Sequence, residues 1–224
     1  ISLWALLRKL SSGDTSQGEV LFVEGITFRE MRARLNAQSD LVHATQSLSD
    51  QAIMAKLGAP DRKPEGWFFP DTYLFPKGES DFVILSAAMT AMKRHLDSSW
   101  KERTSGLPLK SAYEALILAS IVEKETGKAD ERPQVASVFL NRLAKGMKLQ
   151  TDPAVIYGIT KGEGVLGRGL RQSELKRETP WNTYVIAGLP PTPIANPGKL
   201  SIEAALHPAK TDYLFFVANV EGGH

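Results

Sequence analysis

Residues 111–126, SAYEALILASIVEKET, form the most strongly apolar helical pattern of the chain. Apolar side chains surround nearly the whole circumference of this helix, and a helix of this kind lies inside a hydrophobic core. Two carboxylates, Glu123 and Glu125, stand at its C-terminal end. Burial disfavours the charged form of a carboxylate, and the C-terminal end of the helix dipole also disfavours an anion. We therefore expect a carboxyl group with a raised pKa, which general-acid catalysis near neutral pH requires.

The two glutamates also have an ordinary explanation. A glutamate near the end of a helix is often solvated, and Lys124 can pair with either neighbour. At about 100° per residue the two side chains point apart by about 200°, with Glu123 on the side of Leu116 and Glu125 on the side of Ile121. They are therefore not expected to flank one bond as a pair. At most one of them is an acid catalyst, and the other is structural.

Helical patterns continue on both sides of this segment. Apolar residues recur at spacings of three and four before it, and Pro133 and Gly146 mark the first turn and the end of a helix after it. The sequence YLFFVA near the C-terminus is typical of a buried strand. The predicted elements are helices over residues 80–104 and 131–145, short helical stretches near 153–158 and 200–206, and a strand over 213–218.

The N-terminal part differs in character. Its predicted elements are an amphipathic helix over residues 2–10, a strand over 18–25 and a helical stretch over 40–60. Thr27 and Glu30 form a capping box for a helix that continues through Leu35. Residues 64–78, PEGWFFPDTYLFPKG, carry three prolines and five aromatic residues. We expect them to form a packed irregular loop, the wall of a groove, or a plug between two domains. Strand patterns around a helical middle predict the α+β class, with short strands.

Composition excludes several classes of protein. The 224 residues carry a formal charge of +2, contain no cysteine and include 42% apolar residues, which argues against a disordered chain or a disulfide scaffold. Near neutrality gives no support to a nucleic-acid binder. No segment approaches the roughly 18 apolar residues of a membrane span, and the four histidines show no HExxH spacing. We therefore expect no metal and no cofactor. The start at Ile1 and the end at His224 suggest a fragment of a longer protein.

Two further clusters carry groups suited to binding a carbohydrate. Gln150, Thr151 and Asp152 supply an amide, a hydroxyl and a carboxylate in succession, after Asn141 and Arg142 at the end of a predicted helix. Helix capping alone also explains Asp152. Residues 180–184, PWNTY, place aromatic and amide groups beside a proline-rich loop, although a packed surface loop has a similar composition.

These runs resemble a known family. ASIVEKET at 119–126, VASVFLNRL at 135–143, GMKLQTDP at 146–153 and VIYG at 155–158 follow one another along the chain, with EGWFFPDT at 65–72 upstream and NTY, GLPP and HPAK downstream. In this order they closely resemble the MltG/YceG-like family of endolytic murein transglycosylases. The resemblance covers roughly residues 20–224.

The resemblance implies an activity and an organisation. The family cleaves the β-1,4 bond between N-acetylmuramic acid and N-acetylglucosamine in peptidoglycan and leaves a 1,6-anhydromuramyl end without consuming water. It implies a partial LysM-like subdomain at residues 1–38 and a C-terminally truncated catalytic domain at 39–224. It also implies a single N-terminal membrane helix that this chain lacks, a catalytic domain facing the periplasm and cell wall, and partnership with cell-wall synthases (penicillin-binding proteins).

The resemblance also assigns roles to residues. Glu125 matches the catalytic glutamate, acting first as general acid and then as general base, and Glu123 matches a supporting glutamate. The candidates for holding the sugars are Asn141, Arg142, Gln150, Thr151, Asp152, Tyr157, Asn182, Thr183 and Tyr184.

Two other functions fit the same residues. In the first, the chain is a non-catalytic module that binds peptidoglycan or serves as a scaffold for cell-wall synthesis proteins. In the second, the chain hydrolyses the same bond, with Asp152 or Glu123 activating water.

Overall fold

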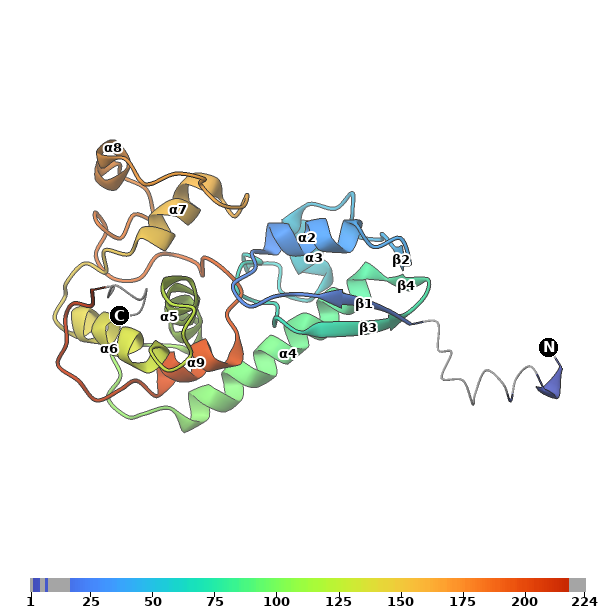
Figure 1. Cartoon of the computed structure of the whole chain (residues 1–224), viewed down its shortest axis with the longest axis horizontal. Helices are drawn as coiled ribbons and strands as arrows, with labels where there is room; N and C mark the ends of the chain where they lie inside the picture. The colour runs from blue at the N-terminus through green and yellow to red at the C-terminus, as the bar shows by residue number, and fades with distance from the viewer. Residues whose placement is uncertain (1, 5–6, 8–16, 218–224) are drawn as a thin grey trace.

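The computed structural model describes residues 2–4, 7 and 17–217 of the chain and shows a mixed, helix-rich architecture with a few short strands (Figure 1). This agrees with the α+β class expected from the sequence. The helix predicted over residues 2–10 falls mostly outside the described residues. Among the described residues, no helix is long and apolar enough to cross a membrane.

The N-terminal elements form two small sheets. Strand β1 (Gln17–Leu21) pairs antiparallel with β3 (Thr72–Pro76), in a register that joins Gln17 to Pro76 and Leu21 to Thr72. Strand β2 (Leu41–Val42) pairs in parallel with β4 (Glu79–Ser80). The first sheet therefore joins segments from both sides of the domain boundary expected at residue 38.

Helix α2 (Phe28–Asn36) begins where the sequence predicts. Thr27 accepts a hydrogen bond from the backbone N–H of Glu30, and the Glu30 carboxylate accepts one from the backbone N–H of Thr27, which confirms the capping box.

The helix expected over residues 40–60 is wrong outside α3 (Asp50–Lys56). Side chains bind the backbone of the preceding loop. Arg32 donates to the carbonyls of Thr45, Gln46 and Leu48, and the buried Asp81 accepts from Thr45. These bonds satisfy the backbone without a helix.

The aromatic segment at residues 64–78 is a buried loop followed by a strand. Trp67, Phe68 and Phe69 are buried, and the ring of Phe68 stacks on that of Phe28 with centroids 4.8 Å apart. The packed loop is confirmed for this part. The next residues form β3, which was not predicted. Its partner β1 lies about 50 residues earlier in the chain, so no local pattern indicates the pairing.

A group of packed helices holds the rest of the core. Helices α4 (Asp81–Glu102), α5 (Ala112–Glu125) and α6 (Arg132–Ala144) lie where the sequence predicts them, and α9 (Lys199–Leu206) packs against all three (Figure 1). Every residue from Ala115 to Val122 of α5 is buried, which confirms the prediction of a central helix. Helix α5 is therefore a fixed axis whose last residue is Glu125.

The region after α6 contains α7 (Asp152–Thr160), at the position predicted near 153–158, and α8 (Gln172–Lys176), which was not predicted. The strand expected over 213–218 is wrong over its described residues, because 213–217 form an irregular segment. Side chains of α6 take carbonyls that a strand ladder would use. Asn141 donates to the carbonyls of Thr211 and Tyr213, and Arg142 donates to that of Leu214.

Candidate active site

Glu125 lies at the C-terminal end of α5 with a partly exposed side chain. The hydroxyl of Thr151 donates a hydrogen bond of 3.0 Å to its Oε2. Thr151 is buried and is the N-cap residue that directly precedes α7. The carboxyl group is therefore held between the end of one helix and the start of another.

A second threonine fixes the first. The backbone N–H of Thr151 donates to Oγ1 of Thr183 at 3.0 Å, and that hydroxyl donates to the carbonyl of Thr151 at 3.2 Å. Thr183 is fully buried. Gln150 is exposed, has a φ of 52°, and donates its backbone N–H to the carbonyl of Thr183. The segment containing Thr183 thus sets the position of the hydroxyl that binds Glu125.

Asn182 holds the same loop from inside the protein. Its amide donates to the carbonyls of Glu174, Leu175 and Arg177 at the end of α8. Its Oδ1 accepts the backbone N–H of Tyr184. Because Asn182 and Thr183 have no exposed surface, they position neighbouring residues in this structure and present no atom to a ligand.

Tyr184 and Asp152 form the exposed side of the cluster. The phenol donates a hydrogen bond of 2.6 Å to Oδ1 of Asp152, the first residue of α7. Burial raises the pKa of Tyr184, and Asp152 raises it further by accepting the bond and by its charge. The phenol therefore stays protonated in the neutral pH range and acts as a donor.

Arg142 brings a positive charge to the cluster. It is 7% exposed, and its guanidinium donates to the carbonyls of Leu149 and Leu214. Burial lowers the pKa of Arg142, whereas the negative charge of Glu125 raises it. The amide of its neighbour Asn141 donates instead to the carbonyls of Thr211 and Tyr213.

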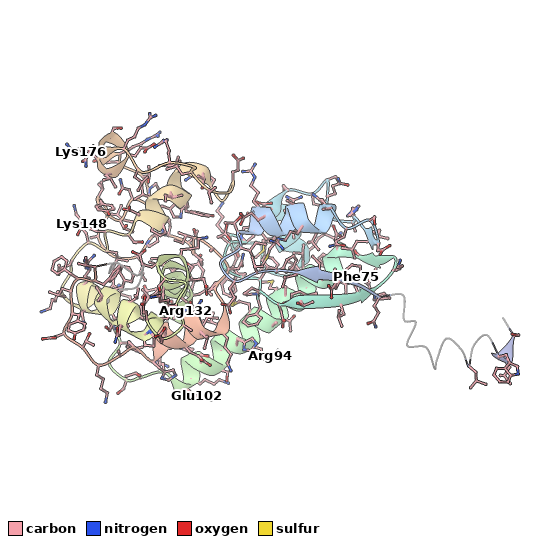
Figure 2. The ribbon with its side chains drawn as sticks, in the orientation of Figure 1. Phe75, Arg94, Glu102, Arg132, Lys148 and Lys176 are labelled. Carbon is pink, nitrogen blue, oxygen red and sulfur yellow. The ribbon has the colours of Figure 1, made fainter. Side chains whose placement is uncertain are left out.

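Glu123 lies in a different environment from Glu125, as the spacing predicts. Its side chain is 5% exposed, and it pairs with Arg132 at 3.0 Å and accepts the backbone N–H of Gly198 at 2.9 Å. Figure 2 shows Arg132 at the packed helices, where these contacts join α5, α6 and the start of α9. Both oxygens of Glu123 have protein partners, so its carboxylate links these helices in the structure.

Two of the predicted binding residues, Asp152 and Tyr157, lie on α7, and Tyr157 points away from the side that carries Asp152. It lies five residues after Asp152, so the two side chains leave the helix about 140° apart. Its ring packs against Trp181 with centroids 5.8 Å apart, and its hydroxyl bonds to Glu65. Glu65 and Trp181 occur in the motifs EGWFFPDT and PWNTY but were not among the predicted site residues. An acidic residue in an aromatic, proline-rich run was the available signal for Glu65.

Glu65 is a buried carboxyl group between the N-terminal elements and α7. It accepts the backbone N–H of Phe28 at 2.9 Å and contacts the amide of Asn196 at 3.3 Å. Burial raises the pKa of Glu65 to about 7, against the lowering effects of the bonds from Phe28 and Tyr157.

Two named bacterial proteins are similar in sequence to this chain. The chain is 33% identical to a Bacillus subtilis protein named endolytic murein transglycosylase, over 99% of this chain and 65% of that protein. It is 28% identical to a protein of the same name from Streptococcus pneumoniae (strain D39), over 90% of this chain and 37% of that protein. The chain therefore spans less than two thirds of the length of each of these relatives.

A solved structure and a family profile complete the comparison. The crystal structure of a YceG-like protein from Listeria monocytogenes superposes with a TM-score of 0.74 at 33% sequence identity, covering 98% of this chain and 76% of that one. The sequence profile of the YceG-like family matches residues 1–224. With the whole sequence matched and the fold shared with a solved member, the chain belongs to the YceG-like family.

Proposed function

We propose that this chain carries the catalytic centre of an endolytic peptidoglycan lytic transglycosylase. It cleaves the β-1,4 bond between N-acetylmuramic acid and N-acetylglucosamine and leaves 1,6-anhydromuramyl ends. The observation that supports this most strongly is the partly exposed Glu125, held by the Thr151 hydroxyl beside Arg142, Asp152 and Tyr184. The names of the Bacillus and Streptococcus relatives agree with this activity.

One carboxyl group can perform both proton transfers of this reaction. Glu125 first gives its proton to the glycosidic oxygen, the bond from that oxygen to C1 of muramic acid breaks, and its electron pair leaves with the N-acetylglucosamine. The Glu125 carboxylate then takes the proton of the muramic C6 hydroxyl while the C6 oxygen bonds to C1. The products balance without water.

The neighbours of Glu125 have separate roles in this proposal. The Thr151 hydroxyl fixes one carboxyl oxygen, and the positive charge of Arg142 stabilises the carboxylate formed by the first proton transfer. Asp152, Tyr184 and Gln150 face solvent at least partly and hold the sugars. Thr183 and Asn182 are positioning residues, because they are fully buried behind this surface.

The same proposal places the chain on the outer side of the bacterial cytoplasmic membrane, since its substrate is the cell wall. Residues 1–38 remain a proposed part of a LysM-like subdomain, and 39–224 a proposed catalytic domain. An N-terminal membrane helix and partnership with cell-wall synthases rest on the family resemblance alone.

The first test is cleavage of purified peptidoglycan by the chain and by its Glu125→Gln variant. The variant should release no soluble fragments while keeping its fold and its binding to glycan, since glutamine cannot supply the proton. Glu102→Gln makes the same chemical change at an exposed position at the far end of α4 (Figure 2) and should leave cleavage unchanged. Full activity of Glu125→Gln would refute the assignment. Binding without cleavage by the unaltered chain would favour the non-catalytic module.

A further inference from the structure

A groove outside the Glu125 cluster lies between the helical part and the N-terminal elements. It consists of two adjoining hollows of about 570 and 630 Å³ that share Lys63, Pro191 and Thr192 in their walls. The first hollow reaches the N-terminal end of α5, and the second lies between α2 and α7. Each hollow has the volume of a site that binds a small molecule or a short peptide. We name these two hollows together the junction groove.

Aromatic rings in the junction groove hold cations in place. The Nζ of Lys161 lies 3.6 Å from the ring centroid of Trp181, and the guanidinium carbon of Arg62 lies 4.1 Å from that of Trp67. Trp67 is only 5% exposed and stacks on Tyr113 with an interplanar angle of 6°. These rings therefore have little free face on which a sugar could stack, and the cations are what the groove offers to a ligand.

The charge balance of the junction groove favours an anion. Within the described part of the chain, four cations of the walls have no ion-pair partner, whereas Asp50 is paired with Arg32 and Glu65 is buried and bound by Phe28. Burial lowers the pKa of Lys161, an effect that a bound carboxylate would offset. Asp61 and Asp97 are the carboxylates left in the walls. The four cations are Arg62, Lys63, Lys93 and Lys161.

The junction groove is within reach of a strand bound at Glu125. Helix α7 begins at Asp152 beside the candidate site and carries Tyr157 into the groove wall, about 7.5 Å further along its axis and about 140° around it. Over the surface of a helix about 10 Å wide this is a path of about 14 Å. In peptidoglycan each muramic acid carries a short peptide that ends in free carboxylates. Five extended residues of such a peptide span roughly 17 Å, which is enough to cover this path.

We propose that the junction groove binds the carboxylate-bearing peptide stems of the glycan strand that the Glu125 site cleaves. This inference rests on the proposed function. Peptide recognition beside the cleavage site would make the chain prefer strands that still carry their stems over strands from which an amidase has removed them.

The test compares binding of these two kinds of strand to the Glu125→Gln chain, which should hold glycan without cutting it. Peptide-bearing strands should bind about fivefold more tightly at low salt, because two or more exposed charge pairs contribute modestly each. The Lys63→Gln, Lys161→Gln double variant should lose most of that preference, and so should added salt. Lys101→Gln, an exposed lysine at the far end of α4, is the matched control and should retain it.

The outcomes separate the two proposals. Equal binding of both kinds of strand, or a preference that survives in the double variant, would overturn the junction groove as a stem site and leave the proposed function standing. Binding of neither strand would overturn the proposed function and this inference with it. Equal thermal unfolding of the double variant and the control would show that any lost preference is not a loss of fold.

Discussion

Thr151 controls the candidate catalytic group through a single hydroxyl. Its bond to Glu125 fixes a carboxyl oxygen, while Thr183 holds its backbone on both sides. Thr151→Val removes the hydroxyl and keeps the shape of the side chain. A hydrogen bond to a charged group contributes about 1.5–3 kcal/mol, so kcat should fall roughly ten- to a hundredfold with little change in KM.

The control for this change is Thr90→Val, an exposed threonine of α4 that bonds to its own helix. It should leave kcat unchanged in the same peptidoglycan assay. An unaltered kcat in Thr151→Val would show that the hydroxyl does not position the acid.

Glu65 makes the stability of the fold depend on pH. Because burial raises its pKa in the folded state to about 7, the folded protein holds a proton that the unfolded chain releases near its ordinary value of 4.5. Protonated Glu65 therefore contributes at most about 3 kcal/mol to the free energy of unfolding. This contribution is present in full below about pH 4.5 and is lost as pH rises through 7. Glu65→Gln mimics the protonated acid and should remove this dependence.

Urea unfolding at pH 5 and at pH 8 measures this effect. The free energy of unfolding of the unaltered chain should fall over that interval relative to that of Glu65→Gln. Parallel pH profiles of the two proteins would contradict a protonated Glu65 in the fold.

At the scale of elements, the pair between Glu123 and Arg132 connects three helices. Both side chains are nearly buried, and Glu123 also binds the backbone N–H of Gly198 just before α9. In Glu123→Gln, Arg132 would keep only its longer contact of 3.4 Å with the half-exposed Glu24, so the free energy of unfolding should fall by at most about 3 kcal/mol. The folded fraction should still cleave peptidoglycan. Loss of cleavage with unchanged stability would instead give Glu123 a chemical role.

The elements differ in how far the sequence could predict them. Helix α5 and the start of α2 follow from local patterns, namely a continuous apolar run and the capping box of Thr27 and Glu30. Strand β3 and the irregular segment at 213–217 depend on partners far away in the sequence. Residues 213–217 have a composition typical of a strand but pair with no other strand within the described residues 17–217. Asn141 and Arg142 instead donate to the carbonyls of Tyr213 and Leu214.

The candidate site shows the same division. The spacing of Glu123 and Glu125 predicts their separate environments, which the structure bears out. No local pattern distinguishes the buried Asn182 and Thr183 from the exposed Gln150 of the same predicted set, because burial depends on how the loops fold over α7. The contact of Glu65 with Tyr157 joins residues about 90 positions apart and was beyond sequence reasoning.

For the whole molecule, α5 provides the axis from which both proposed sites are built. Its 14 residues span about 21 Å. The N-terminal end borders the junction groove, the C-terminal end carries Glu125, and α7 connects the two regions. This arrangement suits a polymer that is held at one region and cut at the other. In the proposed reaction, cleavage of the glycosidic bond consumes no water.

Mass spectrometry of the fragments released in ¹⁸O-labelled water shows whether water enters the product. We expect muramyl ends that are lighter by one water than reducing ends and that carry no ¹⁸O. These ends should be absent when Glu125→Gln replaces the unaltered chain. Reducing muramyl ends labelled with ¹⁸O would contradict the proposed reaction, because they would require a second carboxylate such as Asp152 to activate water.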